Sequence, residues 1–383
     1  MEEIDNFLAQ RSRQGLLRVL RPIAGRSAGK ISLAGREYTD FSSNDYLGLS
    51  QHPKLIAAGK NALEEFGSAV CASRLLSGDL ELHHRLEEKI AGFKNKEAAI
   101  FFNSGYQANT GIISSLCGRQ DAIFCDRLAH ASIIDGAALS RARLFRFRHN
   151  DAGHLEELLK TERHKFKSAL MITESIFSME GDRAPLKELA RLKGKYDCRI
   201  LVDEAHATGI FGRQGSGLVE AEGLTPEIDL IMGTFSKALA GFGAYLAASQ
   251  KTVDYLVNCC RSFIYSTALP ASIAAINLAS IDLVREEPRR RLRLLENAEY
   301  FRAGLQKSGL QIKGSSQIVP VVIGDNFRSA EFSRRLQQKG YWVLPVRPPA
   351  VPAGEARLRF SLSIYHGKAL LGKLIEDIRN IVV

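Results

Sequence analysis

The stretch Asp229-Leu230-Ile231-Met232-Gly233-Thr234-Phe235-Ser236-Lys237 decides the fold of this chain. A short apolar run passes through small residues and ends in a lysine. A second run, Ile200-Leu201-Val202, leads into Asp203-Glu204-Ala205-His206. Short apolar runs bounded by small or polar residues predict strands. The two stretches therefore predict two strands that carry polar groups at their carboxyl ends.

Other short apolar runs alternate with helical patterns along the chain. Strands are predicted at 98–102, 121–125, 169–173, 200–203 and 229–233, and helices at 107–116 and 185–196. Helices between successive strands are typical of an α/β fold with a mostly parallel sheet. In such sheets, ligands bind beyond the carboxyl ends of the strands. The polar groups that follow the strands are therefore the candidate site residues.

The chain changes character after residue 275. A charged helical stretch reaches residue 309, and Pro288 is expected to divide it, because proline ends or kinks a helix. Strands are predicted at 318–323, 342–344 and 357–362, a helix at 329–339, an N-terminal helix over 4–20 and a hairpin at 34–35. With 383 residues, more than one domain is expected. The predicted division is an N-terminal helix and hairpin segment (1–40), a large cofactor-binding domain (41–275) and a smaller α+β domain (276–383).

The composition is that of an ordinary globular protein, with 45% hydrophobic and 25% charged residues. No apolar run approaches the roughly 18 residues that span a bilayer. The acidic start, Met1-Glu2-Glu3-Ile4-Asp5, does not resemble a secretory signal. The six cysteines include no Cys-x-x-Cys pair, so we expect reduced thiols in the cytoplasm and no metal site.

The net charge of +10 leaves nucleic acid, a membrane surface or a polyanionic small molecule open as partners. Arginines gather in two places, at 289–293 and at 141–148. No nucleic-acid recognition motif accompanies them, so we interpret them as an exposed helix face and an exposed strand edge. We therefore expect neither a nucleic-acid nor a membrane partner, whereas a phosphate-rich substrate such as a coenzyme A thioester remains open.

Lys237, Asp203 and His206 together have the chemistry of a pyridoxal phosphate site. The lysine amine forms a Schiff base with the cofactor, and the aspartate pairs with the pyridinium nitrogen. Each residue alone has a structural interpretation, since an aspartate at a strand end often caps a helix and a lysine or histidine can belong to an ordinary loop. Their joint occurrence after two strands favours the cofactor site.

Further polar residues can complete this site. Asn103-Ser104-Gly105-Tyr106 is a strand-to-helix turn, and backbone amides at a helix start bind phosphate. The hydroxyls of Thr234 and Ser236 can also hold a phosphate. His130 follows the predicted strand 121–125 and is placed to stack on a flat ring. The polar loop 173–182 is a further expected wall of the site.

A series of motifs, in order along the chain, resembles the α-oxoamine synthases. These are fold-type I pyridoxal phosphate enzymes, which condense an amino acid with an acyl-CoA and lose carbon dioxide. The motifs are Phe41-Ser42-Ser43-Asn44-Asp45-Tyr46-Leu47-Gly48-Leu49, Ser104-Gly105-Tyr106-Gln107-Ala108-Asn109, Asp126-Arg127-Leu128-Ala129-His130-Ala131-Ser132, Phe177-Ser178-Met179-Glu180-Gly181-Asp182, Val202-Asp203-Glu204-Ala205-His206, Thr234-Phe235-Ser236-Lys237 and Ile264-Tyr265-Ser266-Thr267. With weaker matches they extend from residue 18 to the end of the chain.

The resemblance implies that Lys237 holds the cofactor covalently and acts as acid and base at the substrate carbon. Asp203 would keep the pyridine nitrogen protonated, His206 would bond the ring oxygen, and His130 would stack on the ring. The remaining implied cofactor residues are Gly105, Tyr106 and Thr234 at the phosphate and Ser178 at the cofactor's edge.

The resemblance also implies a substrate set. Arg359 would pair with the amino acid carboxylate, for which a guanidinium fork is suited, and Arg18 would meet the acyl-CoA. Asn44, Arg347 and Ala350 complete the set. Within the family, the Arg-Pro-Pro segment at 347–349 favours the members that use L-alanine and a pimeloyl thioester of coenzyme A or of a carrier protein. A homodimer, with its site between two subunits, is also implied.

Three alternatives remain at this point. Another α-oxoamine synthase or a fold-type I aminotransferase would also need Lys237, Asp203 and Arg359, whereas a basic binding module would hold no coloured cofactor. The patterns of serine hydrolases, zinc proteases and P-loop enzymes do not occur. Ala350 stands where close relatives usually carry a threonine, and the loop at 67–74 is poorer in glycine than usual, so both positions bear on substrate choice.

Overall fold

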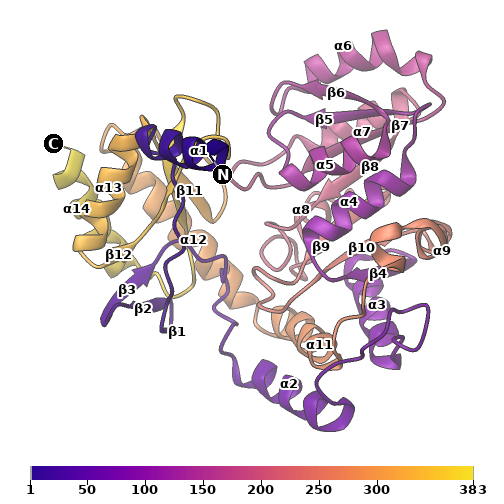
Figure 1. Cartoon of the computed structure of the whole chain (residues 1–383), viewed down its shortest axis with the longest axis horizontal. Helices are drawn as coiled ribbons and strands as arrows, with labels where there is room; N and C mark the ends of the chain where they lie inside the picture. Colours follow the sequence, from indigo (N-terminus) through magenta and orange to yellow (C-terminus); the bar gives the residue numbers. More distant parts are fainter. Residues whose placement is uncertain (1, 383) are drawn as a thin grey trace. The chain divides into compact units, whose positions relative to one another are not determined.

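The computed structural model describes residues 2–382. The chain divides into two compact units, whose elements are labelled in Figure 1. The first unit comprises the chain up to Gly48, Ser178–Asp182 and the chain from Leu292 onward. The second comprises Leu49–Phe177 and Arg183–Arg291. The division into 1–40, 41–275 and 276–383 that the sequence suggests stays a prediction.

Among the described residues, the second unit has one seven-stranded sheet, in the order β4-β10-β9-β8-β7-β5-β6. The strands are β4 (Ala98–Phe102), β5 (Ala122–Asp126), β6 (Arg143–Phe147), β7 (Ala169–Glu174), β8 (Arg199–Asp203), β9 (Leu230–Thr234) and β10 (Ala244–Ala248). β10 pairs antiparallel with β4 and β9, and the other pairs are parallel. The predicted mostly parallel α/β sheet is confirmed. β10 was not predicted, because an alanine-rich run has low strand propensity.

Helices connect these strands. They are α2 (Pro53–Phe66), α3 (Glu81–Lys94), α4 (Gly105–Leu116), α5 (Ala131–Ser140), α6 (Ala152–Glu162), α7 (Leu186–Lys195), α8 (Leu218–Ala221), α9 (Gln250–Cys259), α10 (Arg261–Ile264) and α11 (Ala271–Glu286), with a 3-10 turn at Arg163–Lys165. Polar side chains set several helix starts by accepting a hydrogen bond from the first turn. Ser104 does so for α4, Asp151 for α6 and Ser249 for α9.

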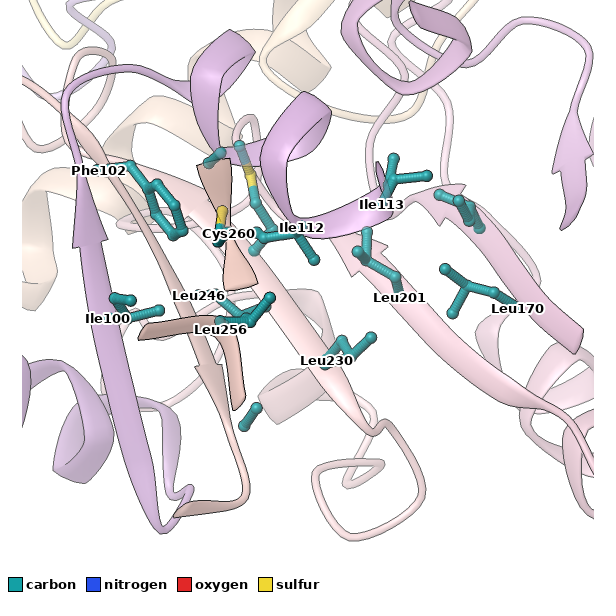
Figure 2. Close-up of a cluster of buried hydrophobic side chains, with 14 of the residues drawn as sticks. Ile100, Phe102, Ile112, Ile113, Leu170, Leu201, Leu230, Leu246, Leu256 and Cys260 are labelled. Carbon is teal, nitrogen blue, oxygen red and sulfur yellow. The ribbon is translucent and has the colours of Figure 1, made fainter. Parts of the chain in front are cut away.

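The core of the second unit lies between its sheet and α4. Ile112 and Ile113 of α4 are buried together with Leu201 of β8 and Leu230 of β9 (Figure 2). Burying such a side chain contributes about 1.5–3 kcal/mol. This packing holds α4, β8 and β9 against one another, and their ends carry the candidate cofactor residues.

The first unit has two small sheets among its described residues, in the orders β1-β2-β3-β12 and β11-β14-β13. Their strands are β1 (Gly25–Ser27), β2 (Lys30–Leu33), β3 (Arg36–Asp40), β11 (Ile318–Gly324), β12 (Tyr341–Trp342), β13 (Pro345–Val346) and β14 (Ala356–Ser361). Leu33 pairs with Arg36, and the two residues between them have positive φ angles of 49° and 76°. That is the backbone of a two-residue hairpin, so the predicted hairpin is confirmed.

The remaining helices are α1 (Glu2–Arg13), α12 (Pro288–Gln306), α13 (Asn326–Gln338) and α14 (Lys368–Val382). α12 begins at Pro288, as the sequence predicted. The predicted helix over 4–20 was wrong in its second half, because α1 ends at Arg13. Gly15 follows with a φ of 64°, and glycine in this conformation terminates helices. None of the helices between residues 2 and 382 is long and apolar enough to cross a membrane.

Candidate functional site

The carboxyl ends of β8 and β9 bring Lys237 and His206 together. The two strands pair in parallel, with Asp203 opposite Met232, so their carboxyl ends lie at the same edge of the sheet. The Nζ atom of Lys237 lies 2.9 Å from Nε2 of His206. The loop after β9 is closed on itself, since the amide of Ala240 donates to the carbonyl of Lys237. The lysine is thereby held at the sheet edge where ligands of α/β proteins bind.

Asp203, the last residue of β8, is a buried and oriented carboxylate. Its exposed fraction is 5%. Oδ1 accepts a hydrogen bond from the amide of Ala205 and Oδ2 accepts one from Nδ2 of Asn109, both at 2.9 Å. Each carboxylate oxygen can accept more than one bond. Asp203 is therefore fixed in direction and can still accept a hydrogen bond from a pyridinium nitrogen.

A hydrogen-bond chain links Asp203 to His130. Nδ2 of Asn109 also donates to Oγ of Ser132 at 3.0 Å, and that oxygen lies 2.8 Å from Nδ1 of His130. Burial lowers the pKa of His130. The negative charge of Asp203 acts against this shift and the positive charge of Lys237 adds to it. His130 is therefore a neutral ring near pH 7, which suits stacking on a cofactor ring better than a charged one.

Glu174 fixes His130 from a second direction. This carboxylate, at the end of β7, accepts a hydrogen bond from the backbone amide of His130 at 2.7 Å. Sequence reasoning did not single out Asn109, Ser132 or Glu174. The available signal was weak, because Asn109 is merely one helical turn after Gly105 on the same side of α4.

The start of α4 offers backbone donors. The Ser104 side chain and carbonyl accept from the amides of Gln107 and Ala108. The amides of Gly105 and Tyr106 precede these, and the first amides of a helix have no partner within it. A Cβ atom at Gly105 would lie 3.2 Å from Cε of Met232 in β9, so little space remains for a larger residue. Such a helix start favours a bound anion.

Thr234 is engaged within the sheet edge. Its hydroxyl donates to the carbonyl of Gly243 at 2.8 Å and lies 2.8 Å from Oγ of Ser236. Because the Thr234 proton is used by Gly243, this hydroxyl can bind a phosphate only after rotating. Ser236 is then the donor in its hydrogen bond with Thr234, so its hydroxyl must also rotate before it can donate to a phosphate.

The donor set of the second unit fits pyridoxal phosphate. Lys237 supplies the amine, Asp203 a carboxylate with spare lone pairs, and the start of α4 amides for an anion. Within residues 2–382, no cluster of three or more His, Cys, Asp or Glu side chains is arranged to hold a metal ion.

The first unit holds the predicted substrate residues. Arg359 in β14 is 9% exposed, and its guanidinium donates to Oδ1 of Asn44 at 3.3 Å, to the hydroxyls of Tyr46 and Ser361, and to the carbonyl of Ser178. All of these acceptors are uncharged. Across the described residues, Arg359 forms no ion pair with a carboxylate. A nearly buried cation with neutral partners only is a suitable place for an incoming carboxylate.

Arg357 shows the contrasting arrangement. It lies two residues earlier in β14, and its guanidinium contacts Glu180 at 2.8 Å and Glu355 at 2.6 Å. Its charge is balanced inside the protein, so Arg357 is a structural arginine.

Arg347 and Arg18 lie close enough to interact. The pKa of Arg347 is lowered by burial and by the positive charges of Arg18 and Arg11. Arg347 also donates to the carbonyl of Gly15, and its own carbonyl accepts from the amide of Ala350 at 3.2 Å. Arg18 and Ala350 are both exposed.

The predicted site residues thus form two groups. The second unit holds the predicted cofactor residues Lys237, Asp203, His206, His130, Gly105, Tyr106 and Thr234. The first unit holds Arg18, Asn44, Ser178, Arg347, Ala350 and Arg359. Ser178 was predicted with the cofactor residues, and the structure describes it through its carbonyl, which accepts from Arg359.

Comparison with known proteins identifies the class. A profile of the class I and II aminotransferases matches residues 36–378. An 8-amino-7-oxononanoate synthase of Geotalea daltonii is 46% identical over 383 residues, covering 99% of this chain and 96% of the relative. One from Geobacter sulfurreducens is 47% identical over 377 residues, covering 98% and 96%.

Solved structures agree. A serine palmitoyltransferase of S. paucimobilis with a bound PLP–myriocin aldimine superposes with a TM-score of 0.94 at 33% identity, covering 99% of this chain and 97% of the other. An 8-amino-7-oxononanoate synthase of Francisella tularensis gives 0.79 at 29% identity, covering 90% and 98%. The chain belongs to the class I and II aminotransferase family, in its α-oxoamine synthase branch of pyridoxal phosphate-dependent acyltransferases.

Proposed function

We propose that this chain is an 8-amino-7-oxononanoate synthase. It condenses L-alanine with a pimeloyl thioester and releases carbon dioxide and the free thiol of coenzyme A or of a carrier protein, in biotin biosynthesis. The structural observation that supports an amino acid as one of the two substrates is Arg359, a nearly buried cation without a carboxylate partner among the described residues. The choice of a pimeloyl thioester as the second substrate is supported by relatives named 8-amino-7-oxononanoate synthase, which match nearly the full length of the chain at 46–47% identity.

Two residues of the second unit, Lys237 and His206, carry out the proton transfers of the reaction. When bound, pyridoxal phosphate is an electron sink for the pair left at the substrate carbon, first by loss of a proton and then by loss of carbon dioxide. Lys237 holds the cofactor, and its released amine takes the α-proton from L-alanine and later returns a proton to the product. His206, 2.9 Å from this amine, orients it and can exchange a proton with it.

Asp203 and His130 set the electronic state and place of the ring. The carboxylate of Asp203 keeps the ring nitrogen protonated, and Asn109 fixes the direction of that carboxylate. The neutral imidazole of His130 would stack on the ring face. The amides of Gly105 and Tyr106 hold the phosphate, with Thr234 at the same end.

The first unit selects the substrates. Arg359 binds the carboxylate of L-alanine, and Asn44 holds the guanidinium in place. Ser178 is proposed, from the family resemblance, to line the cofactor's edge. Arg18 and Arg347, two cations near each other, attract the anionic acyl donor. Ala350 stands where close relatives usually carry a threonine, at a position that would face the amino acid substrate. We further propose a homodimer that works in the cytoplasm.

A panel of thioesters and amino acids tests this function. Purified protein loaded with pyridoxal phosphate is mixed with pimeloyl-CoA, a pimeloyl carrier protein or a shorter acyl-CoA. L-Alanine, glycine or L-serine is the second substrate, and free thiol and carbon dioxide are measured together. The proposal expects both products, in equal amounts, with L-alanine and a pimeloyl thioester.

The same panel separates the alternatives. Another α-oxoamine synthase would prefer a different pair, and an aminotransferase would release neither product but would form pyruvate from L-alanine and a keto acid. Turnover that is highest with a different acyl chain or amino acid would contradict the proposal.

A further inference from the structure

A fully buried ion pair lies behind the cofactor residues of the second unit. Lys94, the last residue of α3, and Glu204, the residue after β8, are both 0% exposed in their side chains. Nζ of Lys94 lies 2.8 Å from Oε2 of Glu204. The same amine donates to Oγ1 of Thr208 at 3.1 Å and to the carbonyl of Ser216. All three donor positions of the lysine therefore have partners.

This pair is not explained by stability alone. Burial, the largest single effect, lowers the pKa of Lys94, but the charge and hydrogen bonding of Glu204 and Tyr245 together raise it more, and the net pKa lies above its usual value. The lysine is therefore charged. Removing two charges from water costs about as much as their attraction returns, and apolar residues of similar size are often as stable. Because every donor of Lys94 and both carboxylate oxygens of Glu204 have partners, the pair points to a role beyond stability.

Glu204 anchors the turn that carries Asp203 and His206. Its amide donates to the carbonyl of Met232 at 2.8 Å, and its carbonyl accepts from the amides of Ala207 and Thr208 at 2.9 Å. Oε1 accepts from the amide of Val219 at 2.8 Å. Every polar group of Glu204 is thus bound, and the residue stands between the two that would touch the cofactor ring.

Asp203 and Glu204 are held by different helices. Successive side chains at a strand end point to opposite faces of the sheet. Asp203 is bound by Asn109 of α4, whereas Glu204 is bound by Lys94 of α3. The turn is therefore held by side-chain contacts from two helices, and loss of either contact would weaken its anchoring.

The network continues to β9, the strand that precedes Lys237. Oγ1 of Thr208 lies 3.0 Å from the hydroxyl of Tyr245 in β10. Tyr245 pairs with Gly233 of β9, and a Cβ at Gly233 would collide with the Tyr245 hydroxyl. A Cβ at Gly217 would likewise collide with the carboxylate of Glu204. The packing around the network leaves no space for rearrangement.

We propose that Lys94 and Glu204 are positioning residues of the cofactor site, which act through the turn from Asp203 to Thr208. The pair holds the carboxylate of Asp203 and the imidazole of His206 in their places relative to Lys237. This inference rests on the proposed roles of Asp203 and His206 and assigns a function to two residues that touch neither cofactor nor substrate.

The direct test is Glu204→Gln in the full chain. In glutamine, an NH2 group replaces one of the two carboxylate oxygens and cannot accept a hydrogen bond. The side chain can therefore accept from Val219 or from Lys94 but not from both, and the turn loses one anchor. The dissociation constant of pyridoxal phosphate is measured by titration of the visible absorbance, and kcat and KM with L-alanine are measured on the loaded enzyme. We expect the dissociation constant to rise and kcat to fall by about 10- to 100-fold, the range seen when partners behind a metal ligand are removed. KM for L-alanine should not change.

Lys96→Met is the matched control. Lys96 is half-buried, and its amine donates to the carbonyls of Thr225 at 2.6 Å and Ile228 at 2.5 Å, away from the turn. Its loss should lower the thermal unfolding temperature but leave cofactor affinity and spectrum unchanged. If Glu204→Gln also lowered only the unfolding temperature, with the cofactor dissociation constant of the parent, the inference would be wrong.

A milder variant covers the case in which Glu204→Gln does not fold. Tyr245→Phe removes one hydroxyl from the network and keeps the ring and the lysine pair. We expect Tyr245→Phe to bind the cofactor more weakly and to change the pH dependence of the cofactor's absorbance. If the dissociation constant and the pH dependence were those of the parent, the inference would be wrong. Cofactor binding is measured without an acyl donor, so a wrong choice of thioester in the proposed function leaves this test intact.

Discussion

The amine of Lys237 lies 2.9 Å from Nε2 of His206, across the carboxyl ends of two parallel strands. A lysine amine is a useful nucleophile and base only when its protonation is controlled by its neighbours. The neighbouring imidazole lies within hydrogen-bond distance of the amine, which allows direct proton exchange. This contact is therefore the centre of the predicted chemistry.

Replacing Lys237 by alanine should abolish turnover. The variant lacks the amine that binds the cofactor and the base that takes the α-proton. Loss of a positioned general base alone costs about 10²–10⁴ in rate. The visible band of the bound cofactor should also disappear, as absorbance spectra would show. Lys251→Ala, at an exposed position of α9, should keep both band and rate. Full synthase activity in Lys237→Ala would refute the assignment.

Asn109→Leu should weaken the cofactor site without unfolding the chain. The leucine has a similar size but cannot donate to Oδ2 of Asp203. A buried acceptor that loses its donor costs about 1–3 kcal/mol. We expect lower affinity for pyridoxal phosphate, measured by absorbance titration. Ser114→Ala, in the same helix but bonded only to carbonyls of α4, should bind the cofactor as the parent does. Equal affinity of the Asn109 variant would speak against the role of Asp203.

Arg359→Lys should raise KM for L-alanine. A lysine keeps the charge but loses the fork that binds a carboxylate at two points. A charge-assisted hydrogen bond is worth about 1.5–3 kcal/mol, which is roughly 10- to 150-fold in KM. Steady-state kinetics with varied L-alanine give the result.

Arg357→Lys is the matched comparison for that variant. It sits two residues away on the same face of β14, and its partners are Glu180 and Glu355. It should lower stability and leave KM for L-alanine unchanged. The same KM shift in both variants would show that Arg359 is merely structural.

His366 should make the protein less stable in weak acid. Burial lowers its pKa from 6.5 to about 3, and the backbone of Asp40 acts only weakly in the opposite direction. Below pH 6.5, this histidine binds a proton in the unfolded chain, whereas in the folded chain it stays neutral until the pH approaches 3. Stability is therefore highest above pH 6.5 and falls toward pH 3, by up to about 1.4 kcal/mol per pH unit.

His366→Asn should flatten this dependence. The asparagine can still accept from the amide of Ser363, which donates to Nδ1 of His366 at 3.1 Å, but it does not titrate. Urea unfolding between pH 4 and 7 would measure the difference in slope. An unchanged slope would mean that other groups account for acid sensitivity.

Much of the fold was readable from the sequence, because buried parallel strands are short apolar runs between helical patterns. The strand order was not, since β10 enters between β4 and β9 from a position later in the chain. The end of α1 was also misjudged, because apolar residues continue after Gly15 while the backbone does not continue as a helix.

The candidate site was readable in part. Lys237, Asp203 and His206 could be proposed from their place after strands, and their catalytic roles stay predictions. Asn109 and Glu174 were not found, because an asparagine in a helix and a glutamate at a strand end carry no local signal of function.

The sequence by itself determined the class of this protein, through Lys237 and the motifs around it, because these depend on residue type and order. Only the tertiary structure decided which polar groups meet. Lys94 and Glu204 are 110 residues apart, and of the two arginines in β14 Arg357 is the one that lies against carboxylates among the described residues. Such contacts arise from the packing of distant segments, which local sequence patterns do not encode.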